Sequence, residues 1–63
     1  MSCAQKLRLA RGKKSGEEVS KAVGISYSAL RMYEAGLRVP RDEIKKRLAE
    51  YYKISVQELF FDD

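Results

Sequence analysis

Residues 16–36 constrain the fold of this chain more than any other part of its sequence. Apolar residues recur there at helical spacings of three or four positions, namely Val19 with Val23 and Leu30 with Tyr33. Gly24 separates the two pairs, and glycine readily takes the left-handed conformation that reverses a chain at the end of a helix. Ile25 follows as an apolar residue expected to pack between the two helices, and Ser26 offers an N-cap oxygen to the second helix. The stretch therefore predicts two short helices joined by a tight turn.

Start and stop signals predict three further helices around this pair, giving five helices and no strand. The expected helices cover about 4–11, 15–24, 26–35, a stretch that begins after Pro40, and a short segment over 55–60. Ser15 with Glu18 and Ser55 with Glu58 both form the pattern of a capping box. The buried side of the fourth helix is expected to hold Ile44, Leu48, Tyr51 and Tyr52.

The charge of the chain is unevenly distributed. Residues 1–47 hold twelve Lys or Arg against five Asp or Glu, whereas residues 48–63 hold one Lys against four acidic residues. A basic body with an acidic tail suits a polyanionic partner on one face. A charged, solvated helical surface would give the same composition, so charge alone leaves both interpretations open.

Length and composition exclude several classes of protein. Sixty-three residues allow one domain with a core of about a dozen side chains. Cys3 is the only cysteine and histidine is absent, so we expect no disulfide, metal site or cofactor. No apolar run could span a membrane and no signal-peptide pattern is present, which favours a cytoplasmic protein without a membrane partner. Without a histidine base, nucleophile elbow, phosphate loop or plausible carboxylate pair, we expect no enzyme.

Five short motifs follow one another in an order and spacing that together form a specific signal. They are Leu7-Arg8, Ser15-Gly16-Glu17-Glu18-Val19, Val23-Gly24-Ile25-Ser26, Tyr33-Glu34-Ala35-Gly36 with Arg38 and Pro40, and Ile54-Ser55-Val56-Gln57-Glu58-Leu59. Over nearly the whole chain they resemble the Cro/repressor-type helix-turn-helix family, also called XRE-like or lambda-repressor-like. The resemblance implies an all-α fold, a compact five-helix lambda-repressor-like domain spanning 1–63, with the helix-turn-helix at about 15–36.

The resemblance also implies a function. Members of the phage or mobile-element repressor type are sequence-specific DNA-binding transcriptional regulators. They bind a palindromic operator in double-stranded DNA as homodimers, through the major groove, and perform no chemistry. Two alternatives stay open, a protein-interaction module that keeps the fold without DNA binding and an antitoxin-type autoregulator that binds its own operator.

The resemblance assigns two sets of residues to DNA. Base contacts are expected from the outer side and start of the third helix, at Ser26, Tyr27, Ser28, Arg31 and Met32. Phosphate contacts are expected at Lys13, Lys14, Ser15, Gly16, Glu17, Arg38 and Arg41. The alternative is that Tyr27 and Met32 only cover the surface of the domain, and that Lys13 and Lys14 only add solubility.

Two positions depart from the usual pattern of the family. Gly16 stands where a side-chain amide commonly contacts a phosphate, so a contact there must use the main chain. Ala35 stands where asparagine is common. The resemblance further implies a partly buried ion pair between Arg8 and Glu34 that holds the first helix against the third, although the two could also be independent surface charges.

An aromatic group marks the C-terminal third of the chain. Four rings, at Tyr51, Tyr52, Phe60 and Phe61, exceed what so small a core needs. Some of them are therefore expected to contact a second copy of the chain, with the acidic tail facing away from DNA. Packing of Phe60 back onto the core is the alternative.

Overall fold

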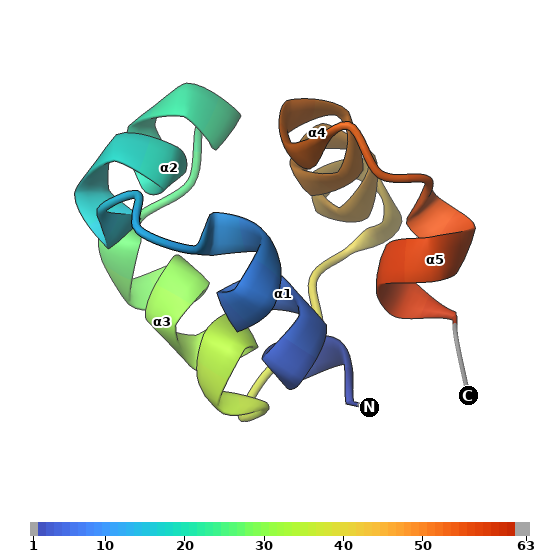
Figure 1. The fold of residues 1–63 in the computed structure, drawn as a ribbon. Helices are drawn as coiled ribbons and strands as arrows, with labels where there is room; N and C mark the ends of the chain where they lie inside the picture. Colours follow the sequence, from blue (N-terminus) through green and yellow to red (C-terminus); the bar gives the residue numbers. More distant parts are fainter. Residues whose placement is uncertain (1, 62–63) are drawn as a thin grey trace.

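A computed structural model describes residues 2–61, which form five α-helices joined by short connections (Figure 1). The helices are α1 (Cys3–Arg11), α2 (Gly16–Val23), α3 (Tyr27–Ala35), α4 (Asp42–Tyr52) and α5 (Val56–Phe60). The predicted all-α fold is confirmed, and the described residues contain no strand. Asp62 and Asp63, which belong to the predicted acidic tail, lie outside the described residues.

Serine side chains begin four of the five helices. Ser2, Ser15, Ser26 and Ser55 each accept a hydrogen bond from the amide three residues further on. A complete capping box forms only at the first of them, where Ser2 N also donates to Gln5 Oε1 at 3.1 Å. This box was not predicted, and it starts α1 one residue earlier than expected. At Ser15 and Ser55 the predicted caps are present without the reciprocal bond to the serine amide.

Left-handed residues end three of the helices. Gly24 and Gly36 have φ angles of 85° and 76° and end α2 and α3 as predicted. Lys53 ends α4 at a φ of 59°, and it is the only non-glycine residue with a positive φ among residues 2–61. A side chain in this conformation is strained relative to glycine.

The core receives one nearly inaccessible side chain from every helix. Leu7, Val19, Leu30, Leu48 and Leu59 are each at most 1% exposed. Val23 and Tyr33 are buried beside them as expected, and Ala49 is buried without having been predicted. The predicted stripe on α4 is only partly inside, because Ile44, Tyr51 and Tyr52 are half-buried and pack against the edge of the core.

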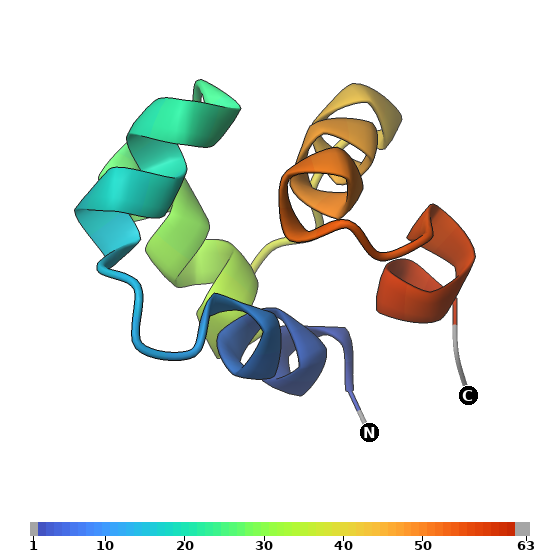
Figure 2. The same cartoon turned by 45° about the horizontal axis from the view of Figure 1, so that its top comes forward.

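The packing of the helices leaves one side of α3 uncovered. Helix α1 packs against α3, α2 packs against α3 and α4, and α5 packs against α4 and α1. Figures 1 and 2 show α2 and α3 together on one side of the molecule and α4 and α5 on the other. The outer side of α3 therefore faces solvent next to the start of α2. None of the described helices has the length and apolar content needed to cross a membrane.

Candidate nucleic-acid interface

The exposed side of α3 carries four of the five residues predicted to contact bases. Tyr27 is 44% exposed, Met32 is 42% exposed, and Ser28 and Arg31 are also exposed. Leu30 on the opposite side lies in the core, which fixes how α3 is rotated. The fifth, Ser26, lies just before the helix, where its hydroxyl oxygen accepts from Ala29 N at 3.0 Å. The four side chains of α3 thus form one continuous polar and apolar surface that core packing orients.

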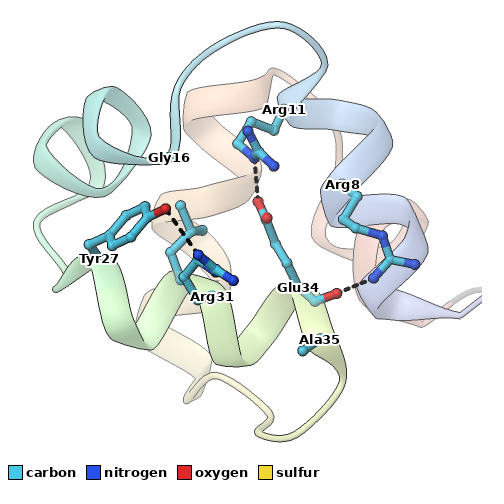
Figure 3. Close-up of a pocket in the computed structure, with 8 residues that line it drawn as sticks. Arg8, Arg11, Gly16, Tyr27, Arg31, Glu34 and Ala35 are labelled. Carbon is cyan, nitrogen blue, oxygen red and sulfur yellow. Dashed lines mark hydrogen bonds and ion pairs between the residues drawn. The ribbon is translucent and has the colours of Figure 1, made fainter.

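The start of α2 lies against the start of α3. Tyr27 Oη accepts a hydrogen bond from Arg31 Nη1 at 3.3 Å, and the Arg31 guanidinium lies 5.7 Å from the centre of the Tyr27 ring. Figure 3 shows the Tyr27 ring directed toward Gly16, the first residue of α2. Together with Arg8, Arg11 and neighbouring residues of α3, these three line a pocket of about 330 Å³.

The N-terminal turn of α2 presents main-chain donors. Ser15 caps the helix, since its Oγ accepts from Glu18 N at 3.0 Å, and the first intrahelical bond runs from Val19 N to the Ser15 carbonyl. The amides of Gly16 and Glu17 precede that bond, and such groups favour an anion together with the helix dipole. This arrangement supports the predicted phosphate contact through the main chain.

The predicted phosphate-binding cations occupy different surroundings. Lys13, Arg38 and Arg41 are exposed, the last as the N-cap residue of α4 without a side-chain cap bond. Lys14 instead turns toward α4, where its ammonium lies 4.7 Å from the centre of the Tyr51 ring and 3.4 Å from the Tyr51 hydroxyl. All four cations are therefore exposed, and the ammonium of Lys14 also contacts the Tyr51 ring.

The predicted ion pair between Arg8 and Glu34 takes a different form in the structure. Glu34 is 6% exposed, and its carboxylate accepts from Arg11 Nε at 2.8 Å, whereas Arg8 donates to the main-chain carbonyl of Glu34 (Figure 3). The hydrogen bond to Glu34 also raises the pKa of Arg11 above its ordinary value. The predicted partner of the carboxylate is thus corrected from Arg8 to Arg11.

Helix geometry explains the exchange of partners. Side chains of an α-helix lean toward its N-terminus, whereas carbonyl groups point toward its C-terminus. Glu34 lies in the last turn of α3, so its carbonyl has no partner further along the helix and is available to Arg8. Its carboxylate leans the other way, toward Arg11, which lies three residues after Arg8 on the same side of α1. The spacing marks Arg11 as a second candidate on that side of α1, and the packing of α1 on α3 selects it.

Comparison with known protein families matches residues 5–59 to the family described as Helix-turn-helix. The chain belongs to this family. Its helix-turn-helix consists of α2, the turn at Gly24 and α3, and the Cro/repressor type predicted from the sequence is confirmed. Searches among curated proteins and among solved structures find no significant match. The family is one of DNA-binding transcription regulators, so the exposed side of α3 is the candidate DNA-reading surface.

The aromatic residues of this helix-turn-helix domain are mostly engaged within the fold. Tyr51 and Tyr52 are half-buried, with ring centres 5.2 Å apart and ring planes at 65°. Phe60 is half-buried and packs against the core, while Phe61 is 53% exposed. The Lys45 ammonium lies 4.7 Å from the centre of the Phe61 ring. Their contact with a second copy stays a prediction, for which Phe61 offers the most accessible ring.

Tyr52 is the one described residue with a buried side-chain polar atom that lacks a hydrogen-bond partner. Burial, followed by the nearby Glu34 carboxylate, raises the pKa of Tyr52 to about 12. A neutral hydroxyl is favoured in the folded state, and its missing hydrogen bond is unfavourable to folding.

We expect Tyr52→Phe to raise the free energy of unfolding at neutral pH by about 1 kcal/mol, because it removes a buried hydroxyl without a partner. The advantage of the variant should grow by about 1 kcal/mol above pH 10, a value reduced for the partial exposure of the ring. In the unfolded chain Tyr52 ionises at its ordinary pKa of 10.0, whereas the folded chain holds the proton to about 12, so wild-type stability falls across this range. Urea unfolding at pH 7, 9 and 11 measures both effects. Tyr51→Phe is the matched control, since the Tyr51 hydroxyl has Lys14 as a partner; an equal gain there would contradict the assignment.

Proposed function

We propose that this chain is a sequence-specific transcriptional regulator of the phage or mobile-element repressor type, acting in the cytoplasm as a homodimer on a palindromic operator. The observation that supports it most is the exposed side of α3, which carries Tyr27, Ser28, Arg31 and Met32. Tyr27 and Arg31 lie next to Gly16 at the start of α2. An α-helix fits the major groove, and these side-chain types match the hydrogen-bonding groups and methyl groups of base edges. Residues 1–63 act as one DNA-binding domain in this proposal.

Each part of the surface has a separate role. Arg31 recognises a guanine, Ser28 and Ser26 bond to neighbouring bases or sugars, and Tyr27 and Met32 contact thymine methyl groups. The remaining predicted contacts are to phosphates and fix the register of the protein on the duplex, at Lys13, Lys14, Ser15, Gly16, Glu17, Arg38 and Arg41. Regulation follows from occupancy of the operator, which excludes or places RNA polymerase without a chemical step.

Two copies are needed because one recognition helix reads too little sequence. A single α3 spans about four or five base pairs, which is too few to select one site in a genome. A two-fold dimer places both α3 helices in successive major grooves, about 34 Å apart, on half-sites whose centres are about 10 base pairs apart. Phe61 caps α5, which lies on the side of the molecule away from α2 and α3, and its exposed ring is available for the dimer contact. So small an interface favours weak dimerisation in solution that strengthens on DNA.

Selection of binding sites from random duplex DNA, followed by sequencing, is expected to return a palindrome. Footprinting should protect both half-sites, and sedimentation of the complex should give two protomers per site, because specificity requires both recognition helices. Protection of a single half-site, or one protomer per site, would contradict the dimer. The Phe61→Ser variant is expected to bind a half-site as wild type does and the full palindrome more weakly.

A protein-interaction module without DNA binding is the second candidate. Three large apolar side chains are strongly exposed, Leu9 at 67%, Leu37 at 80% and Val39 at 74%, and such residues are frequent in protein interfaces. Gel-shift titration of random duplex DNA at low salt separates the two functions, since only a DNA-binding protein slows the migration of the duplex. An antitoxin-type autoregulator would bind DNA as the first candidate does, through the same surface.

A further inference from the structure

Gly16 leaves room for the ring of Tyr27. A Cβ atom at this position would lie 2.6 Å from Cε1 of that ring, closer than real Cβ atoms approach, and in tight contact with Cδ1 at 3.2 Å. The φ angle of Gly16 is not in the left-handed region, so the backbone does not require glycine here. The need for glycine at the first residue of α2 therefore comes from the ring of Tyr27 alone.

Tyr27 in turn restrains Arg31. The Arg31 guanidinium donates to the Tyr27 hydroxyl at 3.3 Å and lies 5.7 Å from the ring centre. These two contacts with Tyr27 restrict where the guanidinium lies relative to α3. The three residues form a chain of contacts from α2 across to α3, which Figure 3 shows from the side of the pocket. Tyr27 and Arg31 are exposed, so this chain of contacts contributes little to the core.

We propose that Gly16 and Tyr27 are positioning residues that hold the Arg31 guanidinium ready to bind a guanine in the major groove. This inference rests on the proposed function and adds to it a role for Gly16 and Tyr27 in base specificity that acts through Arg31, besides their own contacts with DNA. An unrestrained arginine side chain must be ordered when it forms two parallel hydrogen bonds to a base. The contact with Tyr27 orders it beforehand, so less conformational entropy is lost on binding.

The geometry favours positioning over simple surface cover. A ring that only covered the core would not need the space above Gly16. Alanine, a better helix former, could then stand at this position. Instead the ring occupies the space that a Cβ would fill, and its hydroxyl accepts a hydrogen bond from the Arg31 guanidinium, one turn further along α3. Because the ring is a side chain that can swing outward, Gly16→Ala should displace it without unfolding the domain.

Base preference in the selected operator tests the proposal. We expect Arg31→Ala to remove a preference for guanine at one base pair in each half-site, lowering discrimination there by tenfold or more, about the effect of one bidentate contact. Tyr27→Phe should lower discrimination at that same base pair about threefold to tenfold, since it removes one hydrogen bond. Gly16→Ala should have at least as large an effect, because it displaces the whole ring. In the Arg31→Ala background neither change should alter preference at that base pair.

Ser28→Ala is the matched control on the same side of α3, and it should change preference at a different base pair. A reduction in guanine preference with Gly16→Ala or Tyr27→Phe that persists in the Arg31→Ala background would overturn the proposal, because Tyr27 would then be reading the base itself. Unchanged guanine preference with Gly16→Ala would also overturn it. Failure of the wild-type chain to bind any duplex would contradict the proposed function instead. Thermal unfolding confirms that each variant is folded.

A measurement without DNA tests the positioning directly. In the free protein, the ring current of Tyr27 should shift the NMR signals of the Arg31 side chain away from those of a solvated arginine. Gly16→Ala and Tyr27→Leu should bring these signals back to the solvated values, whereas Ser28→Ala should leave them in place. Shifted signals that persist in Gly16→Ala would show that glycine is not needed to seat the ring, and would overturn the proposal.

Discussion

Binding of this chain to duplex DNA is expected to weaken about 10⁴-fold between 50 and 200 mM monovalent salt. If each protomer neutralises about four phosphates, a dimer releases counterions from about eight, which gives a slope of log K against log salt of about −7. In the proposed function, the four exposed cations Lys13, Lys14, Arg38 and Arg41 are the groups that neutralise these phosphates. Fluorescence anisotropy of a labelled operator over a salt series measures the slope.

Single substitutions sharpen this prediction. Arg38→Ala or Arg41→Ala should weaken binding to all sequences alike. Each variant leaves one phosphate in each half-site without its cation, and each such phosphate lowers the magnitude of the slope by about 1. Ser28→Ala is the control, since it should change base preference and leave the slope unchanged. A wild-type slope shallower than about −2 would mean that the basic surface around α3 is not the binding surface.

Loss of the Arg11 side chain is expected to destabilise the fold more than loss of Arg8. Arg11→Ala should lower the free energy of unfolding by about 3 kcal/mol, because it leaves the buried Glu34 carboxylate, whose side chain is only 8% exposed, without its ion-pair partner. Arg8→Ala should lower it by about 1 kcal/mol, since it removes a hydrogen bond to a carbonyl from an exposed side chain. Urea unfolding of the two variants measures the difference.

A double replacement separates pairing from packing. Arg11→Met combined with Glu34→Met should cost much less than Arg11→Ala alone, because no buried charge is left without a partner. Equal losses of stability for Arg8→Ala and Arg11→Ala would show that both arginines pair with the Glu34 carboxylate in solution. Additive effects in the Arg11–Glu34 cycle would mean that this pair is not coupled.

The parts of the fold that could be predicted from sequence depend on local signals. Glycine ends α2 and α3 because a left-handed residue is needed there, and this need is visible at Gly24 and Gly36 without knowledge of the rest of the chain. The rotation of α3 followed from Leu30 and Tyr33 at helical spacing. Ser2 and Gln5 carry an equally local signal, the capping box that starts α1.

The parts that could not be predicted depend on how helices approach one another. The partner of the Glu34 carboxylate is Arg11 because of how α1 is rotated and placed on α3, which spacing alone does not determine. The fit of the Tyr27 ring over Gly16 likewise exists only once α2 and α3 are packed. Lys53 ends α4 in a conformation that favours glycine, so no residue preference marked that position.

The contact of α5 with α1 joins segments far apart in the sequence, with consequences for the order of folding. Lys6 Nζ bonds to the Glu58 carbonyl at 2.8 Å, and Leu59 enters the core beside residues of the other four helices. The contacts of Arg8 and Arg11 with Glu34, between α1 and α3, span 26 and 23 residues. The contact of Lys6 with Glu58 closes a loop of 52 residues and carries a larger loss of chain entropy. The helix-turn-helix can therefore assemble before the core is complete, and the last step is the docking of Leu59 from α5.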